Sequence, residues 1–310
     1  MSWILLAAGA QFLSAIVALL DKYIVSDEKM LPRPFVYAFY TCLIAGLWIF
    51  LYILGLIPFL AGLGMPTFTN IEWPTFDVVF LSLFAGFTFF IALIGMFTAL
   101  KKADTSDVIP VIGAVSAIGS FVLGYFFLGA ALTQNFIIAF ILLALGTFFV
   151  SQLRFSFRVV LYAISSGLLF GAHYVAIKAL FMLTSFDNGF FWSRAGFVVV
   201  ALIVLLIPHY FRIITERTKR AGKRVGGVIF VNKVLAGISA IMILKATDWG
   251  DVAVVQALGG LQFVFILAIG MLMGHTTPSS CGEESCRRKE VIHKALSISI
   301  ITLGFLVLFI

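Results

Sequence analysis

Charged residues are scarce in this sequence. Of its 310 residues, 11% are charged and 62% are hydrophobic. A soluble domain carries about 25% charged residues, so this chain lacks the polar surface that a water-soluble globule needs. Together with a mean hydropathy of +1.13, the low charge excludes soluble, disordered and fibrous classes and indicates an integral membrane protein.

Other patterns are missing as well. The apolar runs do not alternate with polar residues, as the strands of a membrane β-barrel would. The chain has only three cysteines, and the spacing of Cys281 and Cys286 with His275 and His293 fits no standard zinc module. No nucleotide-binding or hydrolase motif is present, which excludes ATP-driven transport by this chain alone. We therefore expect no metal, no cofactor and no enzyme activity.

The apolar residues fall into ten segments, each close to the length of about 20 residues that crosses a bilayer as a helix. Lipid offers no partners to the backbone, so continuous apolar spans should be α-helices. The sequence therefore predicts an all-α integral membrane protein with ten transmembrane helices. These lie at 3–24, 34–57, 76–99, 107–129, 133–151, 158–182, 190–208, 226–246, 251–273 and 292–310.

Most of the net charge of +7 marks one side of the membrane. Basic residues gather in alternate loops, while the opposite loops contain Lys245 alone. By the positive-inside rule the basic loops are cytoplasmic and both termini lie on the other side, in a plasma (inner) membrane. The basic run at 212–224 should touch anionic lipid rather than nucleic acid. The basic loops lie at 22–33, 101–102, 154–158, 212–224 and 287–294.

An internal repeat divides the chain at 1–153 and 154–310. Small or polar residues that lead to a lysine recur with the same spacing in the first helix of each half. Apolar sequences resemble one another easily, but the order of several such markers favours duplication. Five helices per half is odd, so the second half should be inverted, as in alternating-access transporters. The matching residues are Gln11, Ala15, Ala18 and Lys22 in the first half and Gly167, Gly171, Tyr174 and Lys178 in the second.

These features resemble the drug/metabolite transporter (DMT) superfamily, EamA-like branch, over nearly the whole chain. The markers are Lys22 and Lys178, the turn Ala103 to Pro110, the run 123–129, Leu132-Thr133, and the Leu-Gly pairs at 145–146 and 303–304. Two features depart from the family: Ala130 stands where an acidic residue is usual, and the connection from His275 to Ile292 is long. The resemblance implies a ten-helix five-plus-five fold and membrane transport, but it names no solute.

Charged and polar residues inside the spans are the candidates for a solute site, because ionisable groups are costly in a membrane. Lys178 and Arg194 can instead snorkel to the interface, with Asp187 as a partner. His173 and the glutamines can serve helix packing, and the aromatic residues can serve packing or the interfacial belt. The predicted substrate-binding residues are Lys233, Asn232, Tyr174, His173, Lys178, Arg194, Gln11, Gln256 and Trp192.

Acidic residues are confined to loops and helix ends, and Asp21 comes closest to the interior. The remaining cations favour an anionic or zwitterionic solute. We therefore predict a secondary transporter of small organic metabolites, an exporter or exchanger that works by alternating access. A lipid flippase and a non-transporting scaffold or lipid-modifying enzyme are the alternatives. Homo-oligomerisation, and whether Gly259-Gly260 is a flexible gate or a packing site, are left open.

Overall fold

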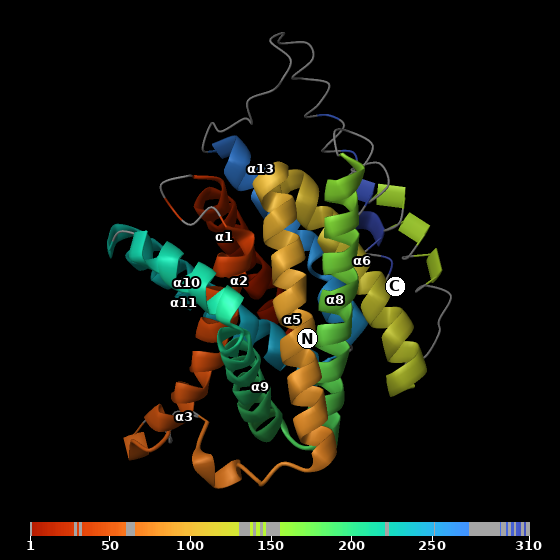
Figure 1. Cartoon of the computed structure of the whole chain (residues 1–310). Coiled ribbons are helices and arrows are strands. Elements are labelled where there is room, and N and C mark those ends of the chain that lie inside the picture. The colour runs from red at the N-terminus through yellow and green to blue at the C-terminus, as the bar shows by residue number, and fades with distance from the viewer. Residues whose placement is uncertain are drawn as a thin grey trace.

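Long apolar helices make up most of the computed structural model (Figure 1). The structure describes residues 2–27, 30, 33–59, 66–129, 156–220, 223–250 and 252–272, with short pieces between 137 and 146 and between 292 and 307. All elements assigned within these residues are helical. Seven of the described helices are long and apolar enough to cross a membrane, which indicates a helical integral membrane protein. They are Trp3–Ser26, Pro34–Leu54, Phe76–Lys102, Thr105–Leu128, Phe157–Leu183, Phe186–Leu206 and Val225–Trp249.

Local sequence signals mark several helix ends. The Thr75 side chain accepts a hydrogen bond from the Val78 N–H (3.4 Å) at the start of α5, and Ser185 does the same for Asn188 (3.2 Å) at the start of α9. Gly129 ends α6 in the left-handed conformation, with φ 68°. The helices are α1 Ser2–Ser26, α2 Pro34–Leu47, α3 Leu51–Leu54, α5 Phe76–Lys102, α6 Thr105–Leu128, α8 Phe157–Leu183, α9 Phe186–Leu206, α10 Pro208–Arg220, α11 Lys223–Trp249, α12 Val252–Ala257 and α13 Gly260–Leu272, with 3-10 turns at Trp48–Phe50 and Phe68–Asn70.

Three of the expected helices show instructive differences from the structure, and the ends of the others shift by a few residues. The segment expected at 190–208 begins earlier, at Phe186, because Ser185 caps it. The segment expected at 34–57 ends at Leu54 and contains a 3-10 turn. The single helix expected at 251–273 is wrong, since α12 and α13 are separated by a turn at 258–259. Glycine lowers helix stability at that point.

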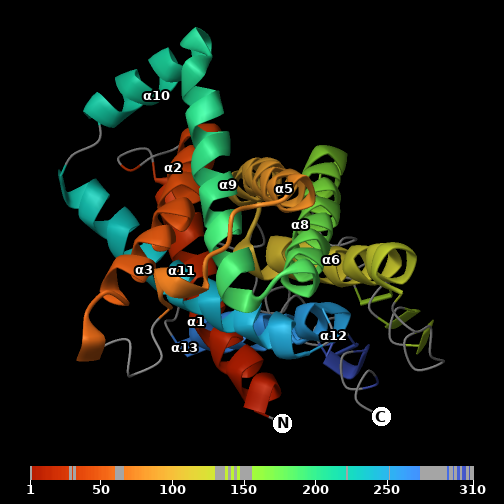
Figure 2. The same ribbon diagram turned by 90° about the horizontal axis from the view of Figure 1, so that it is seen from below.

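The basic segment after α9 is a helix and not a loop. Within α10, Arg212 and Glu216 form an exposed ion pair (3.1 Å), while Ile214 is buried. Tyr210 lies against Phe35, with ring centroids 4.7 Å apart. The helix runs along the outside of the bundle beside α2 and α9 (Figure 2). Helix α10 is basic on one face and apolar on the other. Its many charged residues led the sequence analysis to assign the segment to a loop.

The helices expected at 133–151 and 292–310, and the loop at 275–292, lie outside the residues described as continuous elements. The count of ten transmembrane helices therefore stays a prediction.

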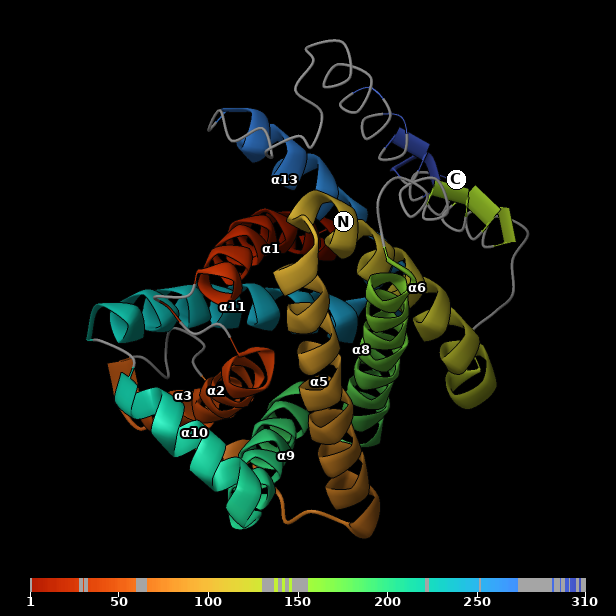
Figure 3. The same ribbon diagram turned by 45° about the horizontal axis from the view of Figure 1, so that its top comes forward.

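Small residues bring the central helices close together. Helix α5 packs against α8 and α9, and α6 packs against α8 (Figure 3). A Cβ on Gly196 would lie 2.3 Å from the Ser82 carbonyl oxygen, and one on Gly171 would lie 2.9 Å from the Ser120 nitrogen. Glycine is thus required at these two crossings, as is usual where membrane helices meet backbone to backbone.

The outside of the bundle is apolar and the inside holds polar groups. Phe76, Phe126, Phe157 and Leu206 are at least 74% exposed, which suits contact with lipid chains. Charged groups on helices, in contrast, include several that are fully enclosed and that define the site described below. Such a distribution is expected where lipid is the solvent for the outer surface.

We expect Gly196→Ala to lower the thermal stability of the purified protein, because the added Cβ meets the fixed backbone of Ser82. Overpacking of this kind costs about 1–3 kcal/mol. Gly227→Ala is the matched control, since nothing lies within 4 Å of a Cβ at that helical position. Thermal unfolding in detergent measures both variants. Equal melting temperatures would contradict the close α5–α9 crossing.

Candidate functional site

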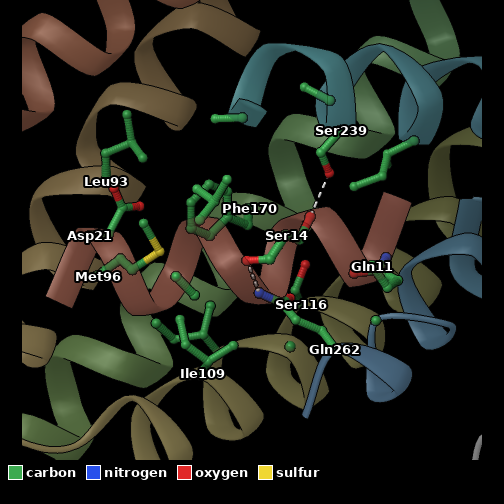
Figure 4. Close-up of a pocket in the computed structure, with 18 of the residues that line it drawn as sticks. Gln11, Ser14, Asp21, Leu93, Met96, Ile109, Ser116, Phe170, Ser239 and Gln262 are labelled. Carbon is green, nitrogen blue, oxygen red and sulfur yellow. Dashed lines mark hydrogen bonds between the residues drawn. The ribbon is translucent and has the colours of Figure 1, made fainter. Parts of the chain in front are cut away.

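Helix α1 presents a polar face to an internal cavity of about 230 Å³. Gln11, Ser14, Ala18 and Asp21 are spaced as one helical stripe and all line this cavity. The other walls come from α2, α5, α6, α8, α11, α13 and the turn between α12 and α13. Figure 4 shows α1 crossing the cavity, with the labelled side chains of the neighbouring helices directed toward it.

A buried ion pair lies at one end of this stripe. The Lys233 ammonium is 2.8 Å from Asp21 Oδ1, and both residues are 3% exposed. The same carboxylate oxygen accepts hydrogen bonds from Asn232 Nδ2 (2.6 Å) and from the Tyr37 hydroxyl. The Lys233 ammonium also lies 4.3 Å from the centre of the Tyr37 ring. These four residues join α1, α2 and α11 in one network, which offsets the cost of burying the two charges.

Asp21 corrects the expectation that the interior holds no carboxylate. It lies five residues from the end of α1 and is nonetheless buried. Because Asp21 neutralises Lys233, the latter no longer argues for an anionic solute by itself. The signal in the sequence was the helical spacing that puts Asp21 on the same face as Gln11 and Ser14.

Hydroxyl and amide groups line the rest of the cavity. Ser14 Oγ lies 2.6 Å from Ser239 Oγ, and Gln262 Nε2 donates to the Ser14 carbonyl at 3.0 Å (Figure 4). These bonds tie α1 to α11 and α13. Ser116 Oγ is buried and has no hydrogen-bond partner among the described residues. The wall of the larger cavity therefore contains a buried hydroxyl whose hydrogen bonds are unsatisfied by the described residues.

A second cavity of about 70 Å³ adjoins the first. Thr41, Phe89, Tyr174 and Lys233 line both, so the two cavities share a wall. Trp48 also lines the second cavity. Its indole lies directly on Gly237, where a Cβ would come within 1.9 Å of the ring.

Two further sequence-predicted residues lie at this second cavity. Arg194 is 4% exposed, which excludes the expectation that it snorkels to the interface. Its guanidinium lies 4.2 Å from the centre of the Phe197 ring and 5.0 Å from that of Phe190. His173 is also buried, with Nδ1 2.9 Å from the Ala85 carbonyl oxygen. A carbonyl can only accept, so Nδ1 carries the proton and Nε2 keeps a lone pair in the neutral ring.

Lys178 lies outside both cavities and binds the end of another helix. Its ammonium donates to the carbonyl oxygens of Thr247 (2.9 Å), Asp248 (3.1 Å) and Gly250 (3.1 Å) at the end of α11. Lys22 does the same at the end of α5, with Leu100 O at 2.7 Å and Ala103 O at 2.8 Å. A cation that binds the free carbonyls of a helix terminus stabilises it.

The remaining predicted residues are placed as follows. Gln11 and Tyr174 line the large cavity. Asn232 is fully buried and stands beside the ion pair. Trp192 lies away from both cavities, with its indole N–H donating to the Glu72 carbonyl at 3.1 Å. The side chain of Gln256 lies outside the described residues.

Comparison with known proteins shows the fold only. No family model and no curated protein matches the chain. One solved structure, described as "Crystal structure of protein", is similar with a TM-score of 0.59 and 17% sequence identity. The similarity covers 99% of this chain and 97% of that one. The chain therefore shares its overall path with a solved protein of nearly the same extent.

We expect Lys233→Met to destabilise the protein by about 3–5 kcal/mol, because it leaves the Asp21 carboxylate buried without its cation. The double variant Asp21→Asn with Lys233→Met should be more stable than Lys233→Met alone, since no charge is then left unpaired. Thermal unfolding of both single variants and the double variant gives the interaction free energy between the two side chains. Lys245→Met is the control, because its pair with Asp248 is 31% and 22% exposed. Purely additive effects of the two substitutions would contradict the pairing.

Lys22→Met and Lys178→Met should each lower the melting temperature by an amount that corresponds to about 1–3 kcal/mol, because several terminal carbonyls lose a charged donor. Arg158→Met removes an exposed cation and should leave the melting temperature unchanged. If Lys178→Met melted at the same temperature as the wild type, the hydrogen bonds from Lys178 to the end of α11 would not stabilise the protein.

Proposed function

We propose that this protein is a secondary transporter of small organic metabolites that works by alternating access. The observation that carries this proposal is a cavity with a polar stripe between apolar helices, to which α1, α5 and α6 contribute from the first half of the sequence and α8, α11 and α13 from the second. A solute site in a membrane transporter is expected between two halves of the bundle. The described helices contribute to that cavity from both halves of the sequence.

Paired helix contacts support an inverted repeat of ten helices, with the halves at 1–153 and 154–310. In this repeat α8 is the second copy of α1, and α11 is the second copy of α5. The contact between α1 and α11 then corresponds to the contact between α8 and α5. The contacts of α1 with α13 and of α8 with α6 form a second such pair. Helix α2 meets its own counterpart α9, and α6 meets its counterpart α12. Contacts related in this way are expected around a pseudo-two-fold axis.

The two capping lysines support the same repeat. Lys22 binds the end of α5, and Lys178, its counterpart in the sequence match, binds the end of α11. The helices capped are themselves counterparts. This agreement favours the resemblance to the drug/metabolite transporter superfamily, EamA-like branch, with basic loops in the cytoplasm of a plasma (inner) membrane. The basic helix α10 then lies on the cytoplasmic side, close to anionic lipid headgroups.

The position of the cavity favours a soluble solute over a lipid. Seven helical segments contribute side chains to its walls, so it lies between helices of both halves of the sequence. A flippase needs a polar groove that reaches the bilayer edge, whereas a central cavity suits a solute that enters from water. The buried Arg194 supports an anionic or zwitterionic solute.

Flux into proteoliposomes over a panel of organic anions, zwitterions, cations and neutral metabolites tests the proposal. At least one solute should enter faster than into protein-free vesicles, with saturation. Ala240→Trp should reduce this flux about tenfold or more, because Ala240 lines both cavities and the indole fills the space. Ile238→Trp is the matched control on the same helix, where the side chain is 41% exposed on the outer surface.

The same vesicles distinguish the alternatives. Loss of leaflet asymmetry of a fluorescent phospholipid, without flux of any solute, would assign the protein to the flippases. Absence of both activities in folded protein would overturn the transport proposal.

A further inference from the structure

Arg194 is a buried cation without a described counter-ion. It lies eight residues into α9, and its side chain is enclosed within the bundle. Among the described residues, its guanidinium makes one hydrogen bond, from Nε to Ser193 Oγ at 3.4 Å, and no carboxylate lies within ion-pair distance. A guanidinium carries five N–H donors and keeps its charge in proteins. Burying a cation without a counter-ion inside a membrane protein costs free energy, and such a residue is therefore a candidate for ligand binding.

The charges around the two cavities leave one positive charge uncompensated. Among the described residues that line them, the charged groups are Asp21, Lys233 and Arg194. Asp21 and Lys233 neutralise each other at 2.8 Å. His173 donates its Nδ1 proton to a backbone carbonyl and adds no charge in its neutral form. A solute with one negative charge would therefore make the site neutral.

Aromatic rings surround the guanidinium. Phe197 lies beneath Arg194, and Phe89 is stacked on Phe197 with centroids 4.7 Å apart and planes 4° from parallel. Phe190 and Trp48 complete this wall of the second cavity. A ligand that reaches Arg194 must lie against these rings. Such a wall suits a ligand with an apolar or aromatic body.

We propose that Arg194 binds the carboxylate of a small monocarboxylate whose apolar body lies along the aromatic wall. This inference rests on the proposed transport function and names the class of solute. A carboxylate matches the planar fork of a guanidinium and can accept two parallel hydrogen bonds from it. A phosphate dianion would leave one negative charge uncompensated in a medium of low dielectric constant. The nearby Nε2 of His173 offers an acceptor for a hydroxyl group next to the carboxylate.

Ligand-induced thermal stabilisation in detergent at constant pH and ionic strength tests the inference without requiring transport. The probes are acetate, butyrate, benzoate and phenylpropionate, each compared with its neutral amide at the same concentration. The acids with larger apolar bodies should stabilise the wild type, and their amides should not. Failure of all four acids to stabilise the wild type would overturn the inference.

Variants of Arg194 locate the effect. Arg194→Met should weaken the apparent affinity for phenylpropionate about tenfold to hundredfold, as loss of a charged hydrogen-bond partner predicts. Arg194→Lys keeps the charge without the fork and should fall between the wild type and Arg194→Met. Arg212→Met removes an exposed guanidinium and should bind like the wild type. Equal affinity of Arg194→Lys and the wild type, both folded by circular dichroism, would contradict binding through the fork.

Flux measurements separate this inference from the transport proposal. Binding of phenylpropionate that depends on Arg194, without flux of any solute, would keep the site and overturn transport. Flux of a cationic or neutral solute that Arg194→Lys leaves unchanged would keep transport and overturn the carboxylate site.

Discussion

The ion pair between Asp21 and Lys233 is the interaction on which the rest of this structure depends. Neither charge can be buried alone in the interior of a membrane protein, because removing an ion from water costs on the order of several kcal/mol. Asn232 and Tyr37 complete the shell of the carboxylate. Through these four side chains, α11 is held to α1 and α2 at one end of the main cavity. The network therefore sets both the packing of three helices and the charge of the space they enclose.

Once that pair is neutral, the electrostatics of the site is decided by Arg194. Its guanidinium is covered by phenylalanine rings rather than by a carboxylate. The cavities thus combine an apolar wall with one positive charge and a few hydroxyl groups. This composition is what links the architecture to the proposed transport of small organic anions.

Sequence patterns located the seven candidate spanning helices among the described residues well, because a run of about 20 apolar residues has few structural solutions in lipid. They were less informative where the environment changes within a few residues. Helix α10 is amphipathic and basic, so its composition resembled a loop. The break between α12 and α13 falls in an apolar run, where glycines at 259 and 260 permit either a straight helix or a turn.

The sequence by itself determined the class of protein and which polar residues would lie among apolar ones. It also matched Lys22 with Lys178, whose ammonium groups bind the ends of α5 and α11. Only the tertiary structure decided how the charges are partnered. Asp21 and Lys233 are far apart in the chain, and Arg194 had an apparent partner in Asp187 a few residues away. Contacts between separate helices depend on how their faces pack, and a helical pattern alone does not specify which faces meet.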